Sequence, residues 1–394
     1  MPNFQTLDDL DARGKRVLLR LDLNLPLQNG HVTDLTRLER SLPTLKELIT
    51  QGAKVIILAH LGRPKGDKKS LSLAPIAKAL GKAMAPTPVL FCESCQGPLV
   101  KKAIDALQTG QILLLENIRF IEGEEKNDPA FAREMADWGD IYVNDAFSAA
   151  HRAHASTEGI AHLLPAYAGR LMEEELNALH HALGSPKRPL MAVVGGAKVS
   201  TKLPLLENLL PKVDVLVIGG AMANTFLAAL GYPIGTSLFE PDLLKTAQSL
   251  LSKTPKILLP QDVVVAQSLE EKGSVKTCPI SEVKGDEKIY DIGSVTCQHI
   301  YEKMKTCHTL LWNGPLGVFE IPPFDKGTTS IARKAAQLTR EGTLLSVAGG
   351  GDTVAALSHA GALNDFTYVS TAGGAFLEWL EGKSLPGVKA LTRV

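Results

Sequence analysis

The chain of 394 residues is long enough for two domains, because single domains typically hold about 100–200 residues. Its 42 basic and 42 acidic residues leave no net charge, which excludes the general attraction to nucleic acid or to an anionic membrane that a basic protein shows. The composition, 45% hydrophobic and 21% charged, is that of a globular protein, and no apolar run is long enough to span a bilayer. We therefore expect a cytoplasmic protein of two domains whose anion sites are built locally.

The five cysteines do not form a disulfide framework, because their number is odd and the chain is large. Cys92-Glu93-Ser94-Cys95 is a lone Cys-x-x-Cys pair. A structural zinc would need a second ligand pair, and Cys278, Cys297 and Cys307 do not have that spacing. We predict reduced thiols, as is usual in the cytosol, and a redox role of Cys92 and Cys95 stays open.

Four short apolar runs in the first half of the chain each end in a polar cluster. These are residues 17–21 before Asp22-Leu23-Asn24, 55–59 before His60-Leu61-Gly62-Arg63, 112–115 before Glu116-Asn117-Ile118-Arg119, and 141–143 before Asn144-Asp145. Residues with helical periodicity lie between them, for example from 38 to 49 and from 99 to 107. This alternation indicates a parallel sheet, and ligands of such sheets bind beyond the carboxyl ends of the strands.

Arginines and a histidine gather at or just beyond these strand ends: Arg37, His60, Arg63, Arg119 and Arg152. One arginine after a strand is usually a solvated surface residue, but the repetition favours a local basic site. A small, doubly anionic molecule fits it, because the guanidinium fork matches phosphate and carboxylate oxygens in pairs. His151 and His154 are more simply loop residues than metal ligands, since no third ligand accompanies them.

Arg37 lies shortly before Ser41-Leu42-Pro43, which we interpret as the beginning of a helix, because proline suits a first helical turn. The backbone of Arg37 is then close to the end of an element, so its long side chain can project into a cleft between the two expected domains.

Apolar residues recur at helical spacing over residues 171–183, with three glutamates near the beginning, and Gly184-Ser185-Pro186 follows. We predict a connecting helix with a domain boundary near Gly184. The alternative is an ordinary surface helix within one domain.

In the second half the strands end in glycines. Residues 190–194 precede Gly195-Gly196, 215–218 precede Gly219-Gly220, 344–348 precede Gly349-Gly350-Gly351-Asp352, and 368–370 precede Thr371-Ala372-Gly373-Gly374. Glycine lets backbone approach a ligand closely, as around the base and phosphates of a nucleotide. Asp352-Thr353 opens a helical pattern whose N-terminus suits phosphate, and Asp352 suits a Mg²⁺ that bridges phosphates.

Lys198 and Lys202 are four residues apart, hence on one face if helical, and both can reach phosphate. A further strand and loop cover residues 310–320, where Glu320 can accept hydrogen bonds from ribose hydroxyls. The P-loop motif and a well-placed Gly-x-Gly-x-x-Gly fingerprint are both missing from the sequence. A P-loop enzyme and a standard dinucleotide dehydrogenase are therefore disfavoured.

Taken together, these motifs resemble the phosphoglycerate kinase family. The residues that carry the resemblance are, in order, 17–26, His60-Leu61-Gly62-Arg63-Pro64-Lys65-Gly66, Glu116-Asn117-Ile118-Arg119-Phe120, 195–202, 312–320 and Gly349-Gly350-Gly351-Asp352-Thr353. The resemblance implies reversible phosphoryl transfer between 1,3-bisphosphoglycerate and ADP, giving 3-phosphoglycerate and ATP, with Mg²⁺. It also implies a glycolytic enzyme that is usually a monomer.

The implied fold is α/β, with two Rossmann-like lobes, each a parallel sheet flanked by helices, joined by a connecting helix and separated by a cleft. Residues 1–170 would form the phosphoglycerate-binding lobe, 171–184 the connecting helix and hinge, and 185–378 the nucleotide-binding lobe. Residues 379–394 would return to the first lobe.

The resemblance also assigns residues to each site. The phosphoglycerate site would comprise Asp22, Leu23, Asn24, Arg37, His60, Leu61, Gly62, Arg63, Arg119 and Arg152. The nucleotide site would comprise Gly195, Lys198, Lys202, Gly219, Asn313, Glu320, Gly350, Gly351, Asp352 and Thr353. Catalysis would rest on Arg37, Lys198, Lys202, Gly373 and Gly374, with Asp352 as the Mg²⁺ ligand.

Three positions depart from the family pattern. Ser148-Ala149 stands where Gly-Thr is usual, Arg170 replaces an apolar residue or proline, and Ala372 replaces the first glycine of three. We expect Ala372 to alter backbone contacts to the transferring phosphoryl group and Ser148-Ala149 to stiffen a loop.

The acceptor carboxylate of 3-phosphoglycerate is ionised near neutral pH, so the reaction needs no general base. Catalysis then consists of positioning and charge neutralisation, and we expect the lobes to close and exclude water. Two alternatives remain at this point: a two-domain α/β NAD-dependent dehydrogenase and a non-catalytic anion-binding protein.

Overall fold

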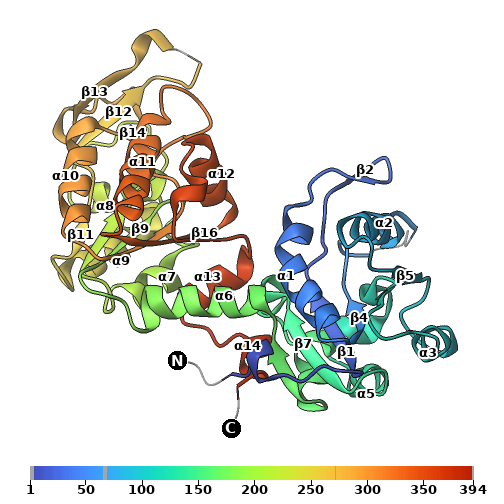
Figure 1. Cartoon of the computed structure of the whole chain (residues 1–394). Coiled ribbons are helices and arrows are strands. Elements are labelled where there is room, and N and C mark those ends of the chain that lie inside the picture. The colour runs from blue at the N-terminus through green and yellow to red at the C-terminus, as the bar shows by residue number, and fades with distance from the viewer. Residues whose placement is uncertain (1–3, 65–68, 271, 393–394) are drawn as a thin grey trace. The chain divides into compact units, whose positions relative to one another are not determined.

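The computed structural model describes residues 4–64, 69–270 and 272–392 (Figure 1). The backbone divides into two compact units. The first contains the residues up to Asn177 together with those from Ser384 onward, and the second runs from Ala178 to Lys383.

The first unit is built on a parallel sheet with the strand order β5-β6-β4-β1-β7-β8. Its strands are β1 (Arg16–Leu21), β4 (Lys54–Leu58), β5 (Val89–Cys92), β6 (Ile112–Leu115), β7 (Ile141–Asp145) and β8 (Ala166–Ala168). The four predicted strands are β1, β4, β6 and β7. The sequence analysis missed β5 and β8, because β8 has three residues and β5 exposes Leu90 in the middle of its apolar run.

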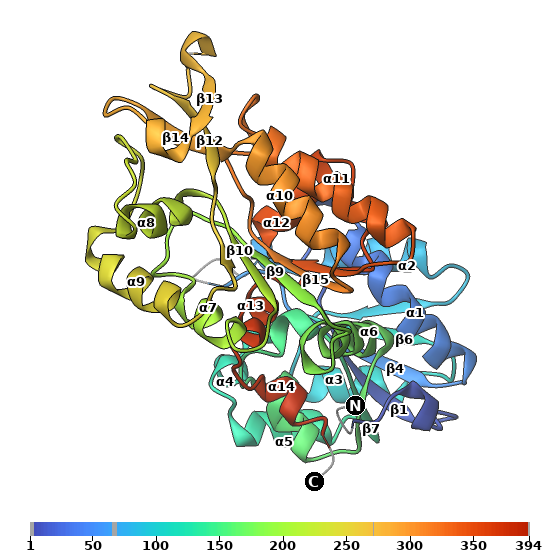
Figure 2. The same ribbon diagram turned by 90° about the vertical axis from the view of Figure 1, so that its left-hand side faces the viewer.

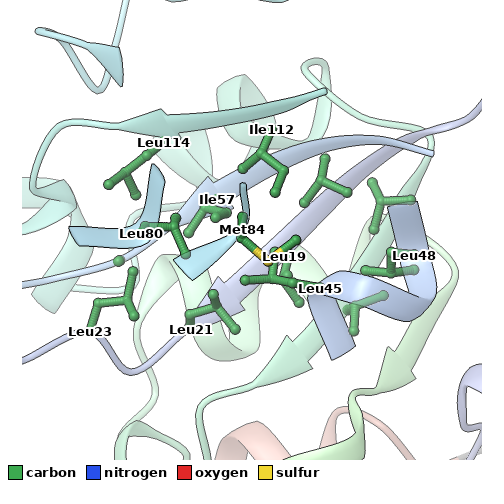
Figure 3. Packing of buried hydrophobic residues seen from close by; sticks show 14 of the residues in the cluster. Leu19, Leu21, Leu23, Leu45, Leu48, Ile57, Leu80, Met84, Ile112 and Leu114 are labelled. Atoms are coloured by element: carbon green, nitrogen blue, oxygen red, sulfur yellow. The ribbon is translucent and has the colours of Figure 1, made fainter. Parts of the chain in front are cut away.

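Helices cover the first sheet, and a small hairpin of β2 (Leu27–Gln28) and β3 (His31–Val32) follows β1. The helices are α1 (Thr36–Thr50), α2 (Ala74–Ala83), α3 (Pro98–Asp105), α4 (Glu122–Glu125), α5 (Pro129–Ala136) and α14 (Pro386–Lys389). The alternation along β1 decides what each face carries. Leu19 and Leu21 pack with Leu45 of α1 and Leu80 of α2 in one buried cluster (Figure 3). Arg20, between them in the sequence, therefore faces the opposite side of the sheet.

The second unit has a parallel sheet with the order β11-β10-β9-β15-β16-β17. Its strands are β9 (Leu190–Val194), β10 (Val215–Ile218), β11 (Ile257–Leu258), β15 (Thr309–Asn313), β16 (Leu345–Gly349) and β17 (Tyr368–Ser370). Its helices are α7 (Leu203–Leu209), α8 (Ala221–Ala229), α9 (Leu244–Ser252), α10 (Ser294–Lys305), α11 (Lys326–Arg340), α12 (Gly351–His359) and α13 (Gly374–Leu380). Figure 2 shows α10, α11 and α12 on one side of this sheet and α8 and α9 on the other.

An additional antiparallel sheet with the order β13-β12-β14 belongs to the second unit. It is formed by β12 (Asp262–Ala266), β13 (Lys276–Pro279) and β14 (Lys288–Ile292), and Val263 and Val265 pack against Leu227 of α8. The sequence analysis missed this sheet, because it followed only strands that end in a glycine turn. Apart from this addition, the predicted α/β fold of two parallel sheets flanked by helices is confirmed.

The segment predicted as a connecting helix forms α6 (Arg170–Leu179), which continues into a π-helical turn at His180–Gly184. All five cysteines carry free, buried thiols. Among the described residues, no helix has both the length and the apolar character needed to cross a membrane.

Candidate active site

The carboxylate of Asp22, directly after β1, accepts hydrogen bonds from three segments of the first unit. Its Oδ1 accepts a hydrogen bond from the backbone N–H of Asn24 at 3.1 Å. Its Oδ2 accepts one from Nη1 of Arg37 at 3.0 Å and another from the hydroxyl of Ser148. β7 lies beside β1 in parallel register, with Leu21 opposite Asp145, and this brings Ser148 to the same edge.

Arg37 is the second residue of α1, which begins at Thr36. The expectation that the helix begins around Pro43 is therefore wrong, since Pro43 lies inside α1. An Asx turn precedes the helix instead, in which the Asp34 carboxylate accepts the backbone N–H of Thr36 at 2.8 Å. Arg37 nevertheless lies at the end of an element, and its Nη1 also approaches the carbonyl oxygen of Asn24 at 3.4 Å.

His60 contacts a fully buried arginine that the sequence analysis did not select. Nη2 of Arg20 lies 2.9 Å from Nδ1 of His60, and Nε of Arg20 donates to the hydroxyl of Ser156 at 2.9 Å. Burial, and then the charges of Arg20 and Arg119, hold the pKa of His60 well below its ordinary value. His60 is therefore neutral at physiological pH. The sequence does offer a signal for Arg20, because a charged residue stands inside the otherwise apolar run of β1.

Arg119 connects two of the strand-end loops. Its Nη1 donates to the carbonyl oxygen of Gly62 at 2.7 Å, and its Nε lies 3.6 Å from a carboxylate oxygen of Glu125. The N–H of Gly62 donates in turn to Oδ1 of Asn24 at 2.9 Å. Burial, followed by the charge of Arg20, lowers the pKa of Arg119, although a guanidinium stays protonated.

The other predicted residues of the phosphoglycerate site differ in how far their side chains are exposed. Arg63 is exposed, and half-buried Arg152 donates from Nε to Nε2 of His151 at 3.2 Å. The side chains of Leu23 and Leu61 are buried in the core cluster, so only their backbone groups are left for a ligand.

In the second sheet, β9 and β15 approach each other at their carboxyl ends through glycines. A Cβ on Gly195 would lie 1.8 Å from the carbonyl oxygen of Pro315, and one on Gly314 would lie 2.1 Å from that of Gly195. The N–H of Gly195 donates to the carbonyl oxygen of Asn313 at 2.9 Å. No side chain fits between these two strand ends, which explains the glycines at both.

Lys202 and Asn313 link three strand ends. Nζ of Lys202 donates to Oδ1 of Asn313, and Nδ2 of Asn313 donates to the carbonyl oxygen of Gly349 at 2.7 Å. Burial lowers the pKa of Lys202, while the charges of Asp352 and Glu381 oppose that shift.

Lys198 is exposed and lies, like Lys202, in the loop before α7, which begins at Leu203. The two lysines are therefore not on one face of a helix, and their spacing of four residues carries no helical meaning here.

The glycines after β16 lead into α12, which begins at Gly351, as the sequence predicts. Gly350 has a φ of 101°, in the region that favours glycine, and the hydroxyl of Thr353 accepts the N–H of Gly314 at 2.7 Å. Asp352 lies exposed in the first turn of α12. Gly373, with a φ of 48°, directly precedes α13 in the same way.

A cavity of about 590 Å³ opens beside these glycine turns. Of the predicted nucleotide residues, Glu320 and Asp352 line it. Gly196, Gly220, Leu238, Leu316, Val318 and Tyr290 contribute to its backbone and apolar walls. Such a mixture suits a flat aromatic base together with a polar ribose and phosphates. Gly219 lies beneath the wall, because a Cβ there would meet the side chain of Leu316 at 2.3 Å.

The sequence analysis missed Asp291, a buried carboxyl group on the cavity wall. Its Oδ2 accepts the N–H of Gly327 at the beginning of α11 at 2.7 Å, and burial raises its pKa to about 7. It lies on β14, in the antiparallel sheet that was not predicted. Within the described ranges, no group of three or more His, Cys, Asp or Glu side chains is arranged to hold a metal ion.

Comparison with known proteins yields one family. The family model described as phosphoglycerate kinase matches residues 7–383. The chain belongs to the phosphoglycerate kinase family. The phosphoglycerate kinase of Azorhizobium caulinodans is 56% identical over 397 residues, and the match covers 100% of both chains. That of Zymomonas mobilis is 58% identical over 394 residues, with 98% of this chain and 99% of the relative covered.

Solved structures agree with this assignment. The phosphoglycerate kinase structure from Coxiella burnetii matches with a TM-score of 0.91 at 45% identity, and that from Pyrococcus horikoshii with 0.81 at 31%. Each covers 98% of both chains. The chain is therefore a glycolytic phosphoglycerate kinase, a phosphotransferase with a carboxyl acceptor that uses 3-phosphoglycerate or 1,3-bisphosphoglycerate and ADP or ATP. The dehydrogenase alternative is not supported.

Arg170 and Ala372, like Ser148, have hydrogen-bond partners in the structure. The guanidinium of Arg170 pairs with Glu47 of α1 at 2.7 Å, with Asp8 at 2.6 Å and with Glu173 at 2.9 Å. It thereby attaches the beginning of α6 to the first unit. The N–H of buried Ala372 donates to the hydroxyl of Ser370 at 3.2 Å.

Proposed function

We propose that this phosphoglycerate kinase binds 3-phosphoglycerate at the strand ends of the first unit. The observation that carries the proposal is the joining of Asp22, Arg37, Arg119 and the Gly62 loop by hydrogen bonds at one sheet edge. The substrate offers a phosphate, a carboxylate and one hydroxyl. The guanidinium groups match the two anions, and the Asp22 carboxylate suits the hydroxyl as an acceptor.

The nucleotide binds, in this proposal, in the cavity that Glu320 and Asp352 line. The apolar wall of Leu316 and Val318 takes the base, Glu320 accepts from the ribose hydroxyls, and the N-terminal turn of α12 faces the phosphates. Lys202 lies close to this turn, because it donates to Asn313, which donates in turn to the carbonyl oxygen of Gly349 at the end of β16. Gly195, Gly219, Asn313 and Gly350 support the backbone around the phosphates.

Asp352 fits a Mg²⁺ ion that accompanies the nucleotide, because it is an exposed carboxylate at a helix start beside Lys202. Magnesium is commonly held by one or two carboxylates while substrate phosphates and waters complete its shell, so the lack of a larger acidic cluster is compatible with it. When bound, the ion neutralises charge on the phosphates.

Catalysis in this proposal is positioning and charge neutralisation by the chain's own groups. The acceptor carboxylate is already ionised near neutral pH, so the reaction needs no general base. We assign neutralisation of the transferring group to Arg37, whose Nε and Nη2 donate no hydrogen bond within the described part of the chain. Lys202 and the amides of Gly373 and Gly374 complete the set, with Lys198 as a further cation. A monomeric state and a cytoplasmic location remain predictions.

A coupled assay tests the proposal, with 3-phosphoglycerate and ATP as substrates and ADP release as the signal. We expect release that depends on both substrates and on Mg²⁺. An anion-binding protein without activity would bind 3-phosphoglycerate and release no ADP, and that result would overturn the proposal.

Asp352→Ala tests the metal ligand. The variant loses one of the oxygen ligands, so we expect its half-saturating Mg²⁺ concentration to rise by about tenfold or more, with a matching loss of activity at low Mg²⁺. Asp242→Ala removes an exposed carboxylate near the beginning of α9 and is the matched control. Unchanged Mg²⁺ dependence in Asp352→Ala would contradict this role.

A further inference from the structure

The hydroxyl of Ser148 donates a hydrogen bond to the Asp22 carboxylate. Ser148 belongs to a short 3-10 turn, Phe147–Ala149, directly after β7. Its neighbour Ala149 has no polar side-chain atom and is buried, so the pair Ser148-Ala149 presents its one hydroxyl at Ser148.

The hydrogen bond from Ser148 is the second one that Oδ2 of Asp22 accepts. Oδ2 of Asp22 accepts from Ser148 and from Nη1 of Arg37 at 3.0 Å, while Oδ1 accepts the N–H of Asn24 at 3.1 Å. A carboxylate accepts about four hydrogen bonds, so acceptor capacity is left on Oδ1. Because the donors approach from β7, from α1 and from the loop after β1, the carboxylate plane is held in one orientation.

Arg37 depends on this orientation. Its side chain is 36% exposed, and its second contact, to the carbonyl oxygen of Asn24, is long at 3.4 Å. Asp22, at 11% side-chain exposure, is therefore its main anchor. A rotation of the Asp22 carboxylate would move the guanidinium as well as the oxygen available to a substrate hydroxyl.

We infer that Ser148 is a positioning residue for phosphoryl transfer, which orients Asp22 and, through Asp22, the catalytic Arg37. This inference rests on the proposed function, in which Asp22 and Arg37 belong to the phosphoglycerate site. Ser148 itself does not need to touch substrate.

Ser148→Ala tests the inference by steady-state kinetics. We expect the KM for 3-phosphoglycerate to rise and kcat to fall, each by about 3- to 10-fold, with the KM for ATP unchanged, because one hydrogen bond to a charged group is lost. Ser148→Thr retains the hydroxyl and should restore most of both parameters. Ser94→Ala is the control, since the hydroxyl of Ser94 donates to the carbonyl oxygen of Gln96 in a turn without a charged partner.

A purely structural role for Ser148 predicts a different pattern. Thermal unfolding would then shift in Ser148→Ala while KM and kcat stay at wild-type values, and this result would overturn the inference. Kinetics in the Asp22→Asn background provide a second test of the inference. If Ser148 acts through Asp22, adding Ser148→Ala to Asp22→Asn should change the kinetics by less than about twofold. Equal effects of Ser148→Ala in both backgrounds would also overturn it.

Failure of the inference and failure of the proposed function remain distinguishable. If Asp22→Asn alone leaves the kinetics of 3-phosphoglycerate unchanged, the site assignment is wrong. If Asp22→Asn impairs the enzyme and Ser148→Ala does not, only the role of Ser148 is wrong.

Discussion

The two proposed sites lie at the same topological position, the carboxyl ends of a parallel sheet, but one is made mainly of side chains and the other mainly of backbone. In the first unit the groups are charged side chains, such as Asp22, Arg37 and Arg119, which already bond to one another. In the second unit they are mainly backbone, because Gly195 and Gly314 approach too closely for any side chain. The chemistry of the substrates explains the difference. A small dianion is recognised by charge, whereas a nucleotide needs flat contact and many amides.

The difference also has an electrostatic side. In the first unit, burial and then the charges of nearby arginines lower the pKa of two buried histidines, that of His60 well below its ordinary value and that of His154 to about 4. In the second unit, burial lowers the pKa of Lys202 and raises that of Asp291 to about 7. Burial thus favours the neutral form of titratable groups in both units, and in the first unit neighbouring cations add to the shift of the two histidines.

Substitution of Arg37 is expected to have the largest effect on the site that is built from side chains. Arg37→Ala should lower kcat on the order of 10³–10⁵-fold with a much smaller change in substrate affinity, because its charge matters most when negative charge spreads over the transferring group. Arg37→Lys should recover only part of this, since a point charge lacks the planar fork. Steady-state kinetics on both variants measures the effect. A raised KM at wild-type kcat would instead make Arg37 a residue of ground-state binding.

For the backbone-built site the corresponding change is Gly195→Ala. The added Cβ meets the carbonyl oxygen of Pro315, so the strand ends must separate. We expect ADP affinity to fall by about 100-fold or more and the free energy of unfolding by about 3 kcal/mol. Calorimetric titration and thermal unfolding measure both. Gly285→Ala is the control, because a Cβ at Gly285 has no atom within 4 Å; wild-type ADP affinity in Gly195→Ala would contradict the backbone role.

Arg119→Ala sharpens the assignment of each site to its unit. It removes a charge-assisted contact of roughly 1.5–3 kcal/mol and frees the Gly62 loop, so 3-phosphoglycerate binding should weaken about 10- to 100-fold. Arg63→Ala should act in the same direction but less, since Arg63 is exposed. ADP binding should stay near normal in both variants. A large loss of ADP affinity in a calorimetric titration would mean that the two sites are assigned to the wrong units.

The smallest expected effect concerns the neutral histidines. The pKa of His154, about 4, lies below the ordinary 6.5, so its contribution to stability is present above pH 6.5 and is lost as the pH falls toward 4. The groups around it are Arg20, Arg119, Arg152 and His151, with Glu124 at 3.8 Å from Nδ1. Between pH 7 and pH 5 the wild type should therefore lose about 1 kcal/mol more than His154→Gln. Denaturant titrations at both values measure this, and equal losses would show that His154 is not held neutral.

The sequence by itself determined the parallel sheets and the strand ends at which both sites are proposed. Apolar runs that end in polar clusters or in glycines predict strands whose carboxyl ends face ligands, and the motifs around Asp22, His60, Gly195 and Asp352 lie at such ends. Their order along the chain was also enough to recognise the family. These features are local, so periodicity and turn chemistry reveal them.

The tertiary structure alone decided which groups meet. The bond between Ser148 and Asp22 joins residues 126 positions apart, because β7 lies beside β1. The burial of Arg20 against His60 depends on the face of β1 that it occupies, and the place of Asp291 depends on an antiparallel sheet. Contacts of this kind arise from register and packing between distant segments, which neither hydrophobic periodicity nor the spacing of a motif encodes.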